Sequence, residues 1–75
     1  MAMEKRVTIE DVRRDLPEVD VRIGKRKMRG RVYGRKNPFA TVVVETPYGT
    51  IGAEFAWGVI ADCMSNGRAL IVDGR

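Results

Sequence analysis

The feature that most restricts the fold is an alternation of side chains between Lys27 and Arg35. Residues of one parity are basic or aromatic: Lys27, Arg29, Arg31, Tyr33 and Arg35. Those of the other parity are small or apolar: Met28, Gly30, Val32 and Gly34. Because side chains of one parity share a face of a sheet, the pattern predicts a strand with a cationic upper face. Two glycines on the underside are typical of a strand that bends sharply or approaches another backbone closely.

The segments on both sides of this alternation also predict strands. Val19–Ile23 alternates in the same way, and Gly24 begins a tight turn into the basic strand. Phe39–Thr46 contains three consecutive valines, which is typical of a central strand buried on both faces. Thr46–Gly49 has proline and glycine where a type I turn prefers them, so a hairpin into the alternating segment Thr50–Phe55 is expected.

Helical signals lie before and after these strands. Thr8 with Asp11 three residues later predicts a capping box, and Pro17 ends the helix that follows. From about Ala56 the apolar period becomes helical, and Asn66-Gly67 is a good C-terminal stop. Residues 69–73 then predict a short final strand.

This arrangement resembles the small β-barrels of the SH3-like and Sm-like type. The resemblance covers about residues 8 to 55, from the short helix through the glycine-bearing second strand to the apolar third strand. Where Sm-like proteins have the Asp and Met-Asn residues that line the RNA pocket, this chain has Lys36-Asn37-Pro38-Phe39, which argues against a ring-type uridine pocket. A rival architecture is a three-stranded sheet packed on the helix at 56–65, similar to the sheet-reading DNA-binding domains of some integrases.

We therefore expect an α+β fold of order α-β-β-β-β-α-β, with a small, strongly bent antiparallel sheet or an SH3-like barrel. Residues 1–75 form a single domain, and residues 1–6 are a loose N-terminal tail. A chain of 75 residues buries only about 60% of its unfolded surface. Because Cys63 is the only cysteine, no internal disulfide can form, so stability requires either close core packing or a homo-oligomer.

Charge is concentrated in the middle of the chain. The formal net charge of +4 divides into −2 for residues 1–20, +8 for residues 21–44 and −2 for residues 45–75. Such a block favours a polyanionic partner over a merely solvated surface. The leading hypothesis is a cytoplasmic nucleic-acid-binding module, and the alternative is an accessory or inhibitory module that docks on an acidic protein. The predicted binding residues are Lys25, Arg26, Lys27, Arg29, Arg31, Tyr33, Arg35 and Lys36.

Tyr33 has two open interpretations, because it either stacks on a base or covers the arginine stems by cation–π contact. Phe39 is left open between the core and a stacking surface, because it lies beside a turn. Phe55 and Trp57 are expected in the core, as is Cys63, whereas Tyr48 at the hairpin tip is expected to be exposed.

The chain lacks the residues that several other classes of protein need for their function. The chain has no histidine and no P-loop, so we expect no enzyme. We expect no metal, because one cysteine without histidine cannot build a tetrahedral site, and no cofactor, because no dinucleotide fingerprint is present. No apolar run is long enough to span a membrane, and no export signal is visible.

Overall fold

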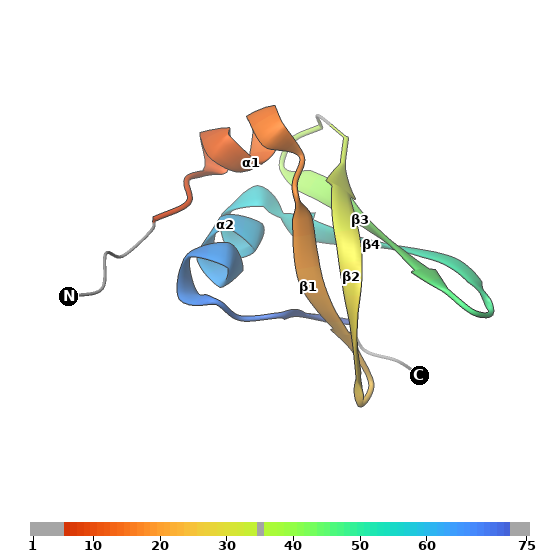
Figure 1. The fold of residues 1–75 in the computed structure, drawn as a ribbon. Coiled ribbons are helices and arrows are strands. Elements are labelled where there is room, and N and C mark those ends of the chain that lie inside the picture. Colours follow the sequence, from red (N-terminus) through yellow and green to blue (C-terminus); the bar gives the residue numbers. More distant parts are fainter. Residues whose placement is uncertain (1–5, 35, 73–75) are drawn as a thin grey trace.

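The computed structural model describes residues 6–34 and 36–72 and consists of one curled five-stranded sheet and two helices (Figure 1). The helices are α1 (Ile9–Asp15) and α2 (Trp57–Asn66). The strands are β1 (Glu18–Ile23), β2 (Arg26–Tyr33), β3 (Phe39–Thr46), β4 (Gly49–Ala56) and β5 (Leu70–Val72). Their order across the sheet is β4-β3-β2-β1-β5. The rival three-stranded architecture is therefore wrong.

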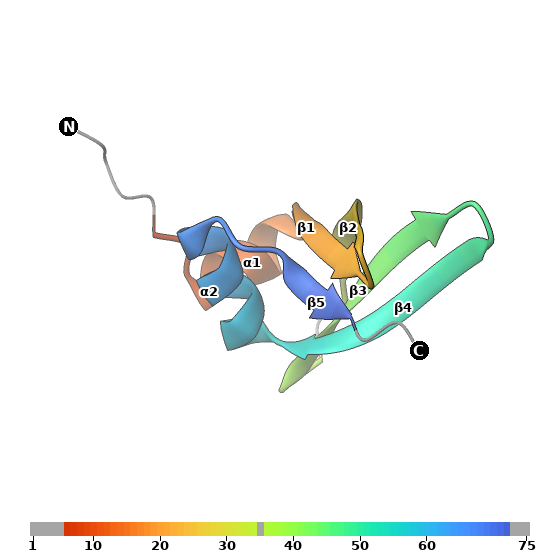
Figure 2. The ribbon, with the colours of Figure 1, turned by 90° about the horizontal axis from the view of Figure 1, so that it is seen from below.

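The sheet curls into a half-barrel, with the helices at one end and the β1–β2 and β3–β4 hairpins diverging from them (Figure 1). Four strands pair antiparallel, but β5 pairs parallel with β1, joining Val21 to Leu70 and Ile23 to Val72. The expectation of a wholly antiparallel sheet is wrong at this edge. Strands joined by a tight hairpin must pair antiparallel. Between β4 and β5, however, α2 carries the chain to the opposite edge of the sheet, where β5 can pair with β1 in either direction (Figure 2).

The first helix begins with the predicted capping box. The Thr8 hydroxyl accepts a hydrogen bond from the Asp11 N–H at 3.1 Å, and the Asp11 carboxylate accepts one from the Thr8 N–H at 3.1 Å. The bond from the Thr8 N–H to the carboxylate lowers the pKa of Asp11 below its ordinary value of 3.8, and the Thr8 side chain and the nearby Arg14 guanidinium lower it further. Leu16 ends the helix in the left-handed region at φ 45°.

Asp11→Asn is expected to destabilise the fold at neutral pH, because the neutral amide loses the charge-assisted bond to Thr8 and the ion pair with Arg14. The pKa of Asp11 is lower in the folded than in the unfolded chain. The ionised carboxylate therefore contributes its full stabilisation of the fold above pH 3.8, and this stabilisation is lost as the pH falls through the folded-state pKa. Chemical denaturation of both proteins across this range measures the difference. If the difference in unfolding free energy between the two proteins stayed constant below that pKa, the lowered pKa would not be due to Asp11.

The core lies between the concave face of the sheet and the two helices. Its fully buried members include Val12 of α1, Ile60 of α2 and Leu70 of β5. On β2 the inner positions are Gly30 and Val32, which are buried, and Met28, which is partly buried. A Cβ added at Gly30 would lie 2.9 Å from Val21 Cγ2, 2.9 Å from Val42 Cγ1 and 3.1 Å from Val44 Cγ2. Gly30 is therefore packed closely against valine side chains of β1 and β3, and not against another backbone as one of the predictions had it.

The convex face of the sheet is not covered by either helix. Val42 and Val44 are buried on the concave side, but Val43 between them is only partly buried. The expectation that β3 is buried on both faces is therefore wrong, because both helices pack against the concave face. Trp57 is buried as expected, Phe55 and Cys63 are partly buried at the edge of the core, and Tyr48 is exposed.

Within the described part of the chain, no helix has the length and apolarity that crossing a membrane requires.

Candidate nucleic-acid interface

The convex face of β2 carries the basic residues that the alternation placed there. Lys27, Arg29, Arg31 and Tyr33 are all exposed, whereas Gly30 and Val32 between them are buried. Lys25 and Arg26 are exposed at the turn into β2, and Lys36 is exposed beyond its other end. Arg35, which the sequence also assigned to this face, lies outside the described residues.

The middle of this face is neutralised by β1. In the antiparallel register Glu18 lies opposite Arg31, and Asp20 lies opposite Arg29. Glu18 contacts both arginines, with Oε1 at 3.3 Å from Arg29 Nη1 and Oε2 at 3.1 Å from Arg31 Nη2. Asp20 Oδ1 lies 3.3 Å from Arg29 Nε. Two of the predicted binding residues are therefore ion-paired within the protein.

These ion pairs matter more for the surface potential than for stability. The arginine side chains are 68% and 53% exposed, and ion pairs this exposed contribute only about 0–1 kcal/mol to folding. A shallow cleft of about 270 Å³ beside them contains both signs of charge, since Glu18 and Glu45 line it together with Arg29 and Arg31. The centre of the convex face is thus not a dedicated anion site.

The excess positive charge lies at the tip of the β1–β2 hairpin. Arg22 and Lys27 are directly opposite each other in the register, and Lys25 and Arg26 form the turn and its exit. Like charges directly opposite across a strand pair destabilise a sheet. Among the described residues, no carboxylate forms an ion pair with any of these four side chains. We call this group, Arg22, Lys25, Arg26 and Lys27, the hairpin cluster.

Aromatic side chains lie at the opposite end of the same face. Tyr33 pairs with Thr41 of β3, and Phe39 is the next residue of β3 on that side of the sheet. Tyr33 is 48% exposed and Phe39 is 49% exposed. The sequence assigned Tyr33 to the cationic face but left Phe39 undecided, because Phe39 lies beside a turn. The strand register places it on the same face as Tyr33.

A buried tryptophan holds the loop that carries Lys36. The Trp57 indole N–H donates to the Lys36 carbonyl at 2.6 Å, and the Arg13 guanidinium lies 5.4 Å from the Trp57 ring centroid. Arg13 also donates to the Asn37 side-chain oxygen at 2.7 Å. Sequence reasoning missed this cluster, because its members come from three separate segments.

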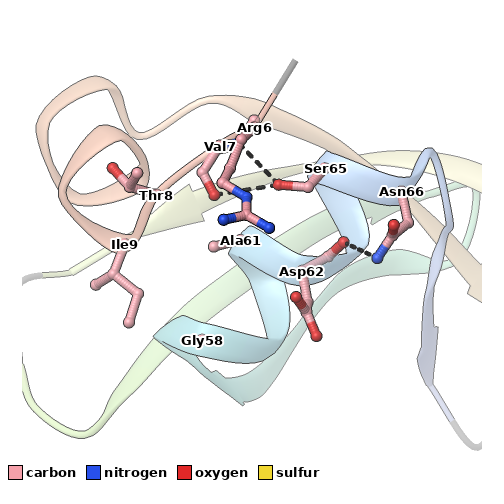
Figure 3. A pocket seen from close by; sticks show the side chains of 9 residues that line it. All are labelled: Arg6, Val7, Thr8, Ile9, Gly58, Ala61, Asp62, Ser65 and Asn66. Atoms are coloured by element: carbon pink, nitrogen blue, oxygen red, sulfur yellow. Dashed lines mark hydrogen bonds between the residues drawn. The ribbon is translucent and has the colours of Figure 1, made fainter. Parts of the chain in front are cut away.

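A groove of about 640 Å³ lies between the N-terminal segment and α2 (Figure 3). The Ser65 hydroxyl bridges the Val7 backbone there, accepting from its N–H at 2.8 Å and donating to its carbonyl at 3.1 Å (Figure 3). Arg6 and Asp62 line the same groove, so it carries both signs of charge. These contacts fasten the chain before α1 onto α2.

Within residues 6–34 and 36–72, no three side chains of the His, Cys, Asp and Glu types lie together as a metal ion would require. Comparison of the chain with protein-family models, with curated proteins and with solved structures finds no match. What the chain binds is therefore inferred from its own residues.

Proposed function

We propose that this chain is a small, non-enzymatic nucleic-acid-binding module on a barrel-like scaffold, with the hairpin cluster as its main phosphate contact. The observation that carries the proposal is the pair of cations directly opposite each other, Arg22 and Lys27, with Lys25 and Arg26 beside them. Their mutual repulsion is a cost of folding, and a row of phosphates would relieve it. Exposed lysines and arginines at a hairpin tip can also reach phosphates without rearrangement of the sheet.

The ion-paired arginines take a secondary part in this proposal. Arg29 and Arg31 are held toward β1 by Glu18 and Asp20, so a phosphate must compete with those carboxylates. Lys36 adds a cation beyond the far end of β2. Binding strength therefore comes mainly from one end of the face, which differs from the uniform cationic strand that the sequence suggests.

The test is a salt titration with single- and double-stranded DNA and RNA. With three to four phosphate contacts from the hairpin cluster, log K is expected to fall against log salt with a slope of about −3 on duplex DNA. Absence of binding to all four at low salt would show that the proposal is wrong. Stoichiometric capture of an acidic protein that persists after nuclease treatment would instead favour the protein-docking alternative.

Removing the two carboxylates of β1 is expected to strengthen binding. Glu18→Gln together with Asp20→Asn frees Arg29 and Arg31 and should steepen the salt slope by up to about 2, because each released arginine can meet one phosphate. Stability should change by only about 1 kcal/mol or less per pair, since the pairs are exposed.

A matched control is Glu10→Gln with Asp62→Asn, which changes net charge equally on α1 and α2, away from the convex face of the sheet. If both double variants tighten binding by the same factor, the gain comes from overall charge and not from the arginines on β2.

A further inference from the structure

We infer that the nucleic acid bound is single-stranded, and that its bases stack on Tyr33 and Phe39; this inference rests on the proposed function. The two rings are diagonal neighbours on the convex face, because Thr41, the partner of Tyr33, is two residues from Phe39 in β3. Diagonal positions in an antiparallel pair have Cβ atoms about 7–8 Å apart. The two positions are therefore close enough for neighbouring bases of one strand to contact both side chains.

Both rings are available to a ligand. Each is about half exposed, at 48% for Tyr33, where β2 ends, and 49% for Phe39, where β3 begins. Large aromatic side chains otherwise gain most by burial, so two of them together on the open face of a sheet form a surface suited to stacking. Because every base has a flat π-face, such a platform accepts bases without a sequence code.

The platform and the hairpin cluster lie along one strand. Lys27 and Tyr33 are six residues apart in β2, which is about 20 Å at the strand rise of about 3.3 Å per residue. At about 3.4 Å per nucleotide this corresponds to roughly six nucleotides, and to fewer in an extended strand. A short single strand can thus place phosphates on the cations and bases on the rings at the same time.

A duplex does not fit both features. Its bases are stacked on one another inside the helix, so their faces cannot reach rings that lie on a sheet surface. Single strands offer unstacked bases, for which aromatic contact contributes about 5- to 150-fold in affinity per base. Tyr33 and Phe39 would contribute nothing to the affinity for a duplex, which would bind through the hairpin cluster alone.

The deciding experiment measures how tightly the unmodified protein binds three ligands, of which the two single strands carry equal charge. They are a single strand of about twelve nucleotides, an abasic strand with the same number of phosphates, and a duplex carrying one strand of that sequence. DNA and RNA versions of the single strand are run in parallel. The intact single strand is expected to bind at least about tenfold more tightly than the abasic strand at the same salt concentration.

Variants then assign the effect to residues. Tyr33→Leu and Phe39→Leu should each weaken single-strand binding about fivefold or more, leaving the salt slope and abasic-strand binding unchanged. Tyr48→Leu is the matched control, because Tyr48 is 95% exposed at the distant β3–β4 turn and should bind as the unmodified protein does.

Equal affinity for the intact and abasic strands, or unchanged binding by both leucine variants, would overturn the stacking inference while leaving the phosphate contact intact. If none of the three ligands binds, the proposed function fails with it. Thermal unfolding of each variant verifies that the fold is retained.

Discussion

Replacing Lys25 and Lys27 with glutamine is expected to weaken binding to a single strand on the order of 60-fold at about 50 mM salt. The loss follows from two phosphate contacts, each of which contributes about −0.7 to the salt slope on single strands. The slope should accordingly flatten by about 1.4, and the affinities of variant and unmodified protein should converge near 1 M salt. Fluorescence anisotropy across a salt series measures both quantities. Glutamine is polar and only one atom shorter than lysine, so the hairpin itself should persist.

The control for this prediction is Arg6→Gln with Arg68→Gln, which lowers net charge equally but away from the convex face. Arg6 lines the groove beside α2, and Arg68 follows that helix. This control is expected to change the slope little. Equal losses from the two double variants would show that the chain attracts nucleic acid by its overall charge, without a site at the hairpin.

Gly30→Ala is expected to lower the free energy of unfolding by about 1–3 kcal/mol, which corresponds to roughly 5–20 °C in melting temperature for a domain of this size. The added methyl would press on three valines of the concave face, two of them at 2.9 Å, and all three lie inside the core. Each valine is stiff at χ1, so the crowding can be relieved only by movement of β1 or β3.

Gly52→Ala provides the matched comparison within the same sheet. A Cβ at Gly52 would meet only Thr41 Cγ2, at an ordinary 3.7 Å, on the convex face of β4. Its melting temperature should stay the same or rise slightly, since alanine restricts the unfolded chain more than glycine does. Similar destabilisation by both substitutions would point to a general backbone effect and against crowding at Gly30.

Local patterns were sufficient for most of the secondary structure. The alternation of β2, the capping box at Thr8 and the stop at Gly67 each depend on residues close together in sequence, and all three are present in the structure. The direction of β5 was not predictable in this way. It depends on where α2 delivers the chain after crossing the sheet, and no local pattern encodes that.

The basic face, too, depends partly on local sequence patterns and partly on the tertiary structure. The sequence by itself determined which side chains of β2 share one surface, because parity along a strand is a local property. Only the tertiary structure decided the charge of that surface. Strand register places Glu18 and Asp20 against Arg29 and Arg31, and leaves Arg22 opposite Lys27. Register is set by the hydrophobic pattern of the strands together with the geometry of the turn, and the resulting pairing concentrates the excess charge at the hairpin tip.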